Sequence, residues 1–314
     1  MKRVLIEGPF DEKIQAEIKA LDSNTEFIFK KRDEISLEDL QNIQALVGNV
    51  NPSWLQSCPN LEWIQLVSAG ANQYMDGIIP EHTILTCMSG AYGVAVAEYL
   101  ITYMLMIMKK IPSYMDNQRE GLWHNEGTVI SPIGKRILVL GTGNIGKEFA
   151  IRAKSLGGYL VGMRRRSGHL EYFDEVHSIK NLKGEVSKAD VIVIVLPGTK
   201  ETYHLFDDHI LSSCKQGSIL MNAGRGNIID RGALVKNASR FKGVYLDVEE
   251  NEPLKSDDLL WSIKNIYITP HITGGYQLDF TVNKITDITK HNIKAWLGEG
   301  EFISVVDLKS GYAK

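Results

Sequence analysis

The sequence predicts an α/β protein built from two doubly wound parallel sheets. The chain has 314 residues, a length typical of two domains. Two successive series of short apolar runs alternate with amphipathic stretches, which is the pattern of parallel strands joined by helices. A glycine-rich turn follows the first strand of the second series and precedes a helical pattern. We therefore expect two α/β units along the chain.

The first unit starts at the N-terminus. MKRVLIEGPF holds only a short apolar run before Glu7, so a first strand is expected there and not a signal peptide. Amphipathic stretches at residues 12–21 and 36–44 predict helices between strands. The expected strands are the apolar runs at residues 4–8, 27–29, 45–47, 63–68 and 83–86.

The second unit follows the segment SPIGK. Its apolar runs are rich in Val, Ile and Leu and almost uninterrupted, as is typical of strands that helices cover on both faces. The expected strands lie at residues 136–140, 159–163, 190–196, 218–222, 243–248 and 265–269.

Two long helical patterns connect the units. A Met-rich helix from about residue 97 to 110 links them, and the pattern at residues 276–298 runs back to the first unit. We therefore expect a first domain from residues 1–98 and 285–314, with a second domain, residues 99–284, inserted in it.

Composition gives no sign of a nucleic-acid or membrane partner. The formal net charge is −3, with 44% hydrophobic and 23% charged residues. The most apolar segment, residues 94–110, is shorter than a membrane span and carries Glu98. Cys58, Cys87 and Cys214 lie far apart and match no metal-binding or redox spacing, as expected of ordinary thiols in a reducing compartment. We expect a cytoplasmic protein without a bound metal.

The run RILVL is followed by GTGNIG, a GxGxxG turn between a strand and a helix. Gly141 permits the tight turn, Gly143 lets the backbone approach a pyrophosphate, and Gly146 lets helix and strand pack closely. The N–H groups around Asn144 and Ile145 would face the anion. The alternative is a glycine-rich turn without a ligand. The flanking pattern favours a Rossmann-type domain that binds NAD or NADP.

The end of the second strand of such a domain selects the cofactor. An acidic residue there, about twenty residues on, binds the ribose hydroxyl of NAD. Here that position holds Arg164, Arg165, Arg166 and Ser167, and the first carboxylate is Glu171. Guanidinium groups match phosphate oxygens, and two contacts of roughly 1.5 kcal/mol each favour NADP about a hundredfold. We expect NADP(H) to be preferred and NAD(H) to be possible, with Arg165 and Arg166 as the phosphate ligands; the alternative is a solvated loop.

Three polar residues follow later strands of the second unit. Arg225, Glu252 and His271 each come just after a strand, and the carboxyl ends of parallel strands form one edge of the sheet. A cation, an acid and an imidazole at that edge would make a proton relay beside an anion anchor, although each alone is more often structural. The neighbouring Glu249 and Glu250 are expected on a solvated acidic turn.

The motifs GTGNIG, NAGRG, LDV…EPL and TPH resemble those of the D-isomer-specific 2-hydroxyacid dehydrogenases. VSAG, the pair Ala97-Glu98, GLW and LPGTKET agree with that family, and the resemblance covers nearly the whole chain. It implies a flavodoxin-like substrate domain that carries the Rossmann-type domain as an insertion. It also implies reduction of a 2-oxo acid to a D-2-hydroxy acid.

The resemblance implies a role for each matching residue. His271 would be the general acid or base, Glu252 would orient its ring, and Arg225 would bind the substrate. Backbone N–H groups of Ala69 and Gly70 would bind the substrate carboxylate as well. Asp247 would contact the nicotinamide. The remaining cofactor contacts would be Leu196, Pro197, Thr202, Ala223 and Gly274.

Positions where the sequence departs from the family's pattern narrow the range of expected substrates. Formate dehydrogenases carry Gln where this chain has Glu252. A phosphoglycerate dehydrogenase needs cations in the first domain, yet residues 33–118 contain no Arg, and GNVNPSW is uncharged. Thr273 stands where the family often has Ala. A small 2-oxo acid is expected, such as glyoxylate, hydroxypyruvate or a short branched-chain analogue. The alternatives are a phosphoglycerate dehydrogenase-like enzyme and an NAD(P)H-binding sensor or corepressor of the same fold.

The resemblance also implies a homodimer. The linking helix is apolar on more than one face and would pack across a two-fold axis. Its methionines, with one that follows it, are Met104, Met106, Met108 and Met115.

Overall fold

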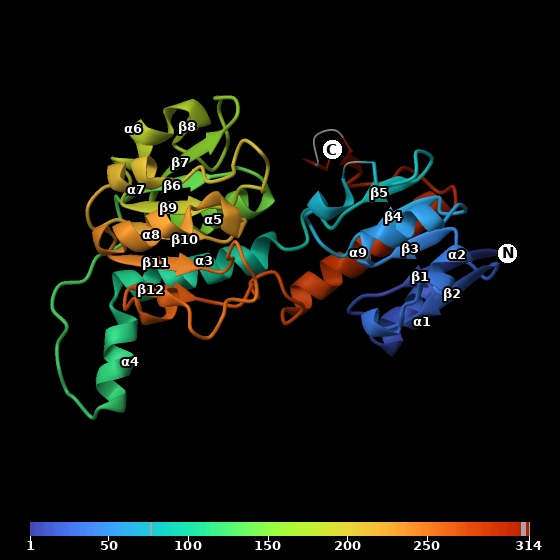
Figure 1. The fold of residues 1–314 in the computed structure, drawn as a ribbon, viewed down its shortest axis with the longest axis horizontal. Coiled ribbons are helices and arrows are strands. Elements are labelled where there is room, and N and C mark those ends of the chain that lie inside the picture. The colour runs from blue at the N-terminus through green and yellow to red at the C-terminus, as the bar shows by residue number, and fades with distance from the viewer. Residues whose placement is uncertain (76, 309–311, 314) are drawn as a thin grey trace. The chain divides into compact units, whose positions relative to one another are not determined.

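The computed structural model describes residues 1–75, 77–308, 312 and 313. It divides into two compact units, Met1–Tyr92 with Gly275–Lys314, and Gly93–Gly274 (Figure 1). The expected boundaries at residues 98 and 284 each fall inside a helix, whereas the division between the units falls at residues 92/93 and 274/275. Helix α3 (Gly93–Met108) belongs whole to the second unit, and α9 (Asp279–Trp296) belongs whole to the first.

The first unit contains a five-stranded parallel sheet in the order β2-β1-β3-β4-β5, the flavodoxin-like order. Helix α1 begins where the Asp11 side chain accepts a hydrogen bond from the Ile14 N–H, and α2 begins at a capping box formed by Ser36 and Asp39. The elements are β1 (Lys2–Ile6), α1 (Glu12–Lys19), β2 (Thr25–Phe29), α2 (Leu37–Gln41), β3 (Ala45–Val47), β4 (Trp63–Gln65) and β5 (Ile84–Thr86).

Apolar side chains from both faces of this sheet are buried. Leu5, Leu46, Ile64 and Leu85 share one buried cluster, and α9 packs against β4 on the sheet. A short antiparallel pair, β13 (Val306–Asp307) and β14 (Tyr312–Ala313), lies near the end of the chain.

The second unit contains a seven-stranded parallel sheet in the order β12-β11-β10-β9-β6-β7-β8. The strand order reverses between β6 and β9, which is the topological switch point of a Rossmann-type fold. The strands are β6 (Arg136–Leu140), β7 (Tyr159–Arg164), β8 (Glu175–Ser178), β9 (Val191–Ile194), β10 (Ile219–Asn222), β11 (Gly243–Leu246) and β12 (Ile266–Ile268). The predicted fold class, two doubly wound parallel-sheet domains, is confirmed.

Helices cover both faces of the second sheet. One face carries α6, α7 and α8, which share a buried cluster with Leu138, Ile192, Leu220 and Val244 of the central strands. Helix α5 packs along α3, which contacts β10. The remaining helices are α4 (Ile111–Arg119), α5 (Asn144–Ser155), α6 (Leu182–Val186), α7 (Asp208–Ser213) and α8 (Arg231–Asn237). Nearly continuous apolar strands are the consequence of this double covering.

The methionines of the linking helix are largely internal. Met104 and Met108 of α3 are fully buried within the second unit, whereas Met115 of α4 is exposed. Over the residues that the structure describes, no helix combines the length and the apolar character needed to cross a membrane.

Candidate active site

The glycine turn between β6 and α5 has the geometry that a dinucleotide requires. Gly141 has a φ of +100°, and a Cβ there would lie 2.7 Å from the carbonyl oxygen of Val195. A Cβ on Gly146 would lie 2.0 Å from the carbonyl oxygen of Gly141, so helix and turn touch backbone to backbone. A Cβ on Gly143 would meet nothing within 4 Å, which leaves room at the start of α5 (residues 144 and 145) for a pyrophosphate. The residues present therefore fit this group.

Two neighbouring loops complete this edge of the sheet. A Cβ on Gly224 would lie 2.6 Å from the carbonyl oxygen of Leu196, and the Ala223 N–H donates to the Ile194 carbonyl at 3.0 Å. The Thr202 hydroxyl donates to the Pro197 carbonyl at 2.7 Å and fixes the loop after β9. The expected cofactor contacts Leu196, Pro197, Thr202 and Ala223 thus occupy two adjoining loops.

The arginine run lies beside the glycine turn. The Gly141 N–H donates to the carbonyl of Met163 at 3.0 Å, one residue before Arg164 ends β7. Arg164, Arg165, Arg166 and Ser167 are all exposed. The run is therefore at the strand end where a dinucleotide-binding domain contacts the ribose.

His271 and Glu252 form a hydrogen-bonded pair. The His271 Nδ1 and a Glu252 carboxylate oxygen are 2.8 Å apart, and the other oxygen of Glu252 accepts from the Glu249 N–H at 2.9 Å. The His271 side chain is 48% exposed and can be reached by a substrate. Because Nδ1 is occupied, Nε2 is the nitrogen available for proton exchange.

The loop that carries His271 is held by Asp247. The Thr269 and Thr273 hydroxyl groups each donate to its buried carboxylate at 2.6 Å, and the Ile272 N–H donates at 3.1 Å. His271 itself has a φ of +52°, and its N–H donates to the Asp247 carbonyl at 2.9 Å. This loop ends at the expected cofactor contact Gly274, the last residue of the unit. Sequence reasoning missed the roles of Thr269 and Thr273, although two hydroxyl residues around a candidate histidine were a usable signal.

Arg225 lies near Glu252 on the turn after β10. Burial lowers the pKa of its guanidinium, and the charge of Glu252 opposes that shift. The Arg225 Nη1 donates to the Gly224 carbonyl at 2.7 Å, while the Asn222 side chain donates to the Arg225 carbonyl at 3.0 Å. No carboxylate among the described residues lies within ion-pair distance of the guanidinium. A half-buried cation without an ion-pair partner suits an anionic substrate.

The acidic turn before Glu252 differs from expectation. Glu250 pairs with the His204 ring at 3.3 Å, and Glu249 is half-buried. Glu249 lines a cavity of about 380 Å³ together with Glu252, His271 and the Trp261 ring. The expectation of a solvated turn is therefore wrong for Glu249, because its Oε1 is inaccessible to solvent.

Ala69 and Gly70 lie in the first unit, in the loop after β4. The Ser68 hydroxyl donates to the Gly70 carbonyl at 2.8 Å, and Ala69 is exposed. The structure brings Arg225, Glu252 and His271 together in the second unit, whereas these two residues belong to the other compact unit.

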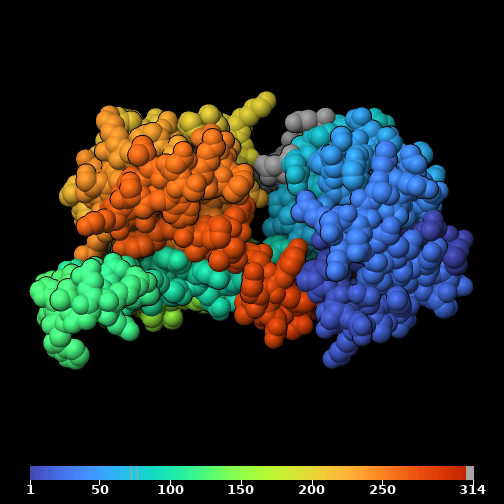
Figure 2. Space-filling model, turned by 60° about the horizontal axis from the view of Figure 1, so that its bottom comes forward, coloured from blue at the N-terminus to red at the C-terminus, as the bar shows by residue number. Residues whose placement is uncertain are grey.

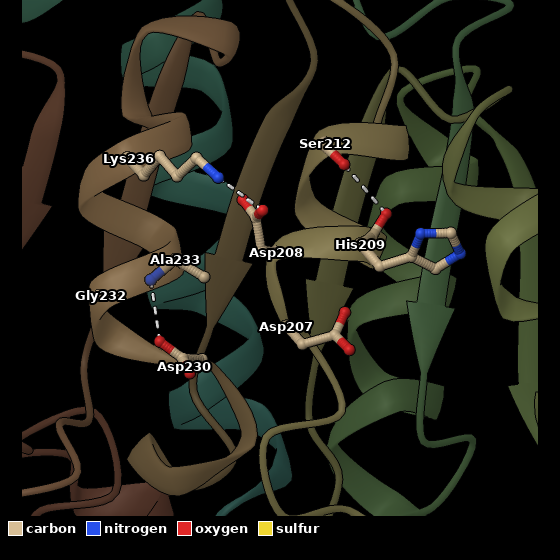
Figure 3. Close-up of a pocket in the computed structure, with 8 residues that line it drawn as sticks. All are labelled: Asp207, Asp208, His209, Ser212, Asp230, Gly232, Ala233 and Lys236. Carbon is tan, nitrogen blue, oxygen red and sulfur yellow. Dashed lines mark hydrogen bonds and ion pairs between the residues drawn. The ribbon is translucent and has the colours of Figure 1, made fainter.

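A second hollow, of about 690 Å³, lies at the starts of α7 and α8 (Figure 3). Its carboxylates already have partners within the fold. Asp207 and Asp230 cap the two helices by accepting from the N–H groups of Ile210 and Ala233, and Asp208 pairs with Lys236 at 2.6 Å. These groups stabilise helix ends and do not form a candidate site.

Glu175, His177 and Glu185 group closely enough to hold a metal ion. The Arg136 guanidinium, however, bonds both carboxylates, at 2.9 and 2.6 Å, and lowers the pKa of Glu175. The arginine thus supplies the positive charge of this cluster.

Comparison with known proteins identifies the family. The family model described as D-isomer specific 2-hydroxyacid dehydrogenase, NAD binding domain, matches residues 101–273, more than half of the chain. A probable 2-ketogluconate reductase from Dictyostelium discoideum is 29% identical over 248 residues, 75% of this chain and 74% of the relative. A glyoxylate reductase from Thermococcus gammatolerans is 28% identical over 256 residues, 76% of each chain.

Solved structures agree with the fold. A D-isomer specific 2-hydroxyacid dehydrogenase family protein from Aeromonas salmonicida has a TM-score of 0.86 and 28% identity, covering 98% of this chain and 99% of that one. An NADPH-dependent glyoxylate/hydroxypyruvate reductase from Sinorhizobium meliloti has a TM-score of 0.85 with 20% identity, a likeness of fold alone, covering 99% of this chain and 100% of that one. Together with the glycine turn and the His271–Glu252 pair, these matches show that the chain is an NAD(P)-dependent oxidoreductase and belongs to the D-isomer-specific 2-hydroxyacid dehydrogenase family.

Proposed function

We propose that this chain reduces a small, non-phosphorylated 2-oxo acid to the D-2-hydroxy acid, with NADPH preferred over NADH. The observation that carries the proposal is the His271–Glu252 hydrogen bond of 2.8 Å close to the half-buried Arg225. A 2-oxo acid offers a carboxylate for the arginine and a carbonyl oxygen that must gain a proton. Glyoxylate, hydroxypyruvate and short branched-chain 2-oxo acids are the proposed substrates.

Each candidate site residue has a separate proposed role in the reaction. The bound nicotinamide supplies the hydride. His271 donates a proton from Nε2 to the carbonyl oxygen, while Glu252 holds the ring through Nδ1 and stabilises its charged form. Arg225 binds the carboxylate and polarises the carbonyl group. Asp247 keeps the histidine loop in place and is proposed to meet the nicotinamide carboxamide, and the N–H groups of residues 69 and 70 are proposed to bind the substrate carboxylate.

The substrate assignment is supported by the names of two relatives and by the lack of arginine in residues 33–118, where a phosphate would need cations. The two relatives are named for glyoxylate and 2-ketogluconate, both 2-oxo acids without phosphate. An assay with purified protein, NADPH and each proposed 2-oxo acid tests the assignment by the loss of NADPH absorbance. Turnover confined to a phosphorylated 2-oxo acid would contradict it.

The preference for NADPH rests on the exposed run Arg164–Ser167 beside the glycine turn. Arg165→Asp should lower the ratio of kcat/KM for NADPH to that for NADH at least tenfold, because a carboxylate repels the 2′-phosphate and accepts the ribose hydroxyl. Lys183→Asp makes the same charge change at an exposed position of α6 and is the control. Equal NADPH-to-NADH ratios of kcat/KM in the wild type and in Arg165→Asp would contradict the proposed phosphate contact and favour the alternative of a solvated loop.

We also propose a homodimer in the cytoplasm. The buried, unpaired Cys58, Cys87 and Cys214 suit a reducing compartment. Helix α4 and residues 120–130 form an arm, drawn as a ribbon in Figure 1 and in green in Figure 2. No residue of α4 is buried, and Leu122 and Trp123, which follow it, are exposed. A second copy of the chain is the proposed occupant of this surface.

A further inference from the structure

Glu249 is a half-buried acidic group that the proposed reaction does not use. Its Oε1 is inaccessible to solvent and has no hydrogen-bond partner among the described residues. Burial raises the pKa of its carboxyl group to about 7. A carboxyl group held this way changes its charge in the pH range where the enzyme works.

The fold ties Glu249 to both sides of the site. Its N–H donates to Glu252 Oε1 at 2.9 Å, so its peptide helps to orient the carboxylate that holds His271. A Cβ on Gly226 would lie 1.9 Å from the Glu249 carbonyl carbon, so the turn that carries Arg225 packs directly on this peptide. Glu249 thus lies between the substrate-binding arginine and the proton-transfer pair.

The groups around Glu249 are mostly acidic. Arg231, at the start of α8, is the nearby cation that favours its ionised form, and Arg231 itself pairs with Asp258. Asp258, Glu252 and Glu250 all disfavour that form. Asp247 and His271 line the same cavity of about 380 Å³. An ionised Glu249 consequently adds a negative charge to the lining of the cavity that His271 also lines.

We propose that Glu249 is a positioning residue for proton transfer: its ionised carboxylate stabilises the protonated imidazole of His271 through the shared cavity, and its peptide holds Glu252. This inference rests on the proposed role of His271 as the proton donor. The contribution of Glu249 to proton transfer depends on pH, since its carboxyl group is neutral at low pH and charged above neutrality.

The sign of the effect follows from the direction of the reaction. Reduction needs protonated His271, so kcat/KM falls as the pH rises and the ring loses its proton. Ionised Glu249 delays that loss in the wild type. Below about pH 6 Glu249 is neutral, so its contribution there vanishes.

Glu249→Gln tests the proposal in the whole enzyme. The midpoint of the alkaline fall in kcat/KM should move down by roughly half a pH unit, so that activity at pH 8.5 or so drops about threefold while activity near pH 6 is unchanged. Glu249→Leu should give the same shift, because it also lacks the charge. Glu250→Gln, which removes a charge that pairs with His204, should leave the midpoint in place.

A second readout does not depend on turnover. The imidazole of His271 is titrated by NMR in the free enzyme, with its signal assigned from a His271→Gln variant, and its midpoint should fall in Glu249→Gln but not in Glu250→Gln. An unchanged midpoint in Glu249→Gln, or an equal fall in both variants, would overturn the inference. If the NMR midpoint shifts while the wild type reduces no 2-oxo acid, the proposed function fails and the charge coupling stands.

Discussion

Arg225 has a charge that the fold leaves without a carboxylate partner among the described residues. Desolvating a guanidinium without such a partner is unfavourable, and the carboxylate of the proposed substrate would compensate for it. The short Nη1 bond to the Gly224 carbonyl fixes the side chain before the substrate arrives. Binding of the proposed substrate would therefore need little reorganisation of this residue.

Arg225→Ala should reduce kcat/KM for the 2-oxo acid by about 100- to 1000-fold, since it removes both the carboxylate contact and the polarisation of the carbonyl group. The dissociation constant for NADPH, measured by fluorescence titration, should stay within about threefold of the wild type. Arg225→Lys keeps the charge but loses the forked geometry, so an intermediate loss is expected. Wild-type turnover in Arg225→Ala would remove this residue from the site.

At the scale of elements, the loop after β12 shows how one carboxylate positions a histidine. Asp247 accepts from two threonine hydroxyls and from backbone N–H groups of residues 272 and 273. The Tyr245 hydroxyl lies 2.8 Å from the Thr269 hydroxyl, which extends the network into β11. This network supports the left-handed conformation of His271, which costs about 1 kcal/mol or more for a non-glycine residue.

Thr273→Val should lower kcat about tenfold with a smaller change in KM, because it deletes one donor to Asp247 and loosens the histidine loop without touching the substrate. Thr273→Ser keeps the hydroxyl and should restore most of the activity. The measurement is steady-state kinetics on both variants, with thermal unfolding as the check on folding. Equal losses in the two variants would assign the effect to packing of the methyl group.

The sequence was most informative where an element is buried on both faces. The runs at 45–47 and 136–140 coincide with β3 and β6 because continuous Val, Ile and Leu leave little choice of structure. Strand β8 was missed: Glu175–Ser178 is a half-buried edge strand, and Arg136 of β6 and Tyr159 of β7 bond its glutamate. Such polar pairing depends on which strands are neighbours in the sheet, so it leaves no recognisable pattern in the local sequence.

Part of the candidate site could likewise be predicted from the sequence and part could not. Arg225, Glu252 and His271 could be grouped in advance because parallel strands deliver their carboxyl ends to one edge. The burial of Glu249 could not, because it depends on how closely the turn at Gly226 packs on its peptide. Local sequence described an acidic turn, and tertiary packing turned one member of it into a group that titrates near neutral pH.

At the scale of the whole molecule, strand order brings three candidate site residues to one edge of the second sheet. The order reverses between β6 and β9, so the loops after these strands diverge and leave space above the glycine turn. The loops after β10, β11 and β12 then contribute Arg225, Glu252 and His271 in sequence along the same edge. The arm that follows α3 carries none of these residues, so its exposed apolar side chains are not explained by the candidate site.

The arm is ordered by polar contacts, without an apolar core of its own. Lys110 donates to the Glu126 carbonyl, and the Asn117 side chain donates to the Glu126 carboxylate at 2.7 Å. Leu122 and Trp123 are 53% and 106% exposed. A surface that such contacts hold in place while it exposes a tryptophan loses less conformational entropy on association, which favours its use as an interface.

Trp123→Glu should therefore convert a dimer to a monomer. Sedimentation at micromolar concentration should give twice the 35.2 kDa of one chain for the wild type and a single-chain mass for the variant. The thermal stability of the isolated chain should change little, because this side chain is fully exposed and its removal leaves no cavity. Phe280→Glu, at an exposed apolar position of α9, is the matched control and should remain dimeric. A monomeric wild type, or a Trp123→Glu variant as dimeric as the wild type, would separate the arm from any role in assembly.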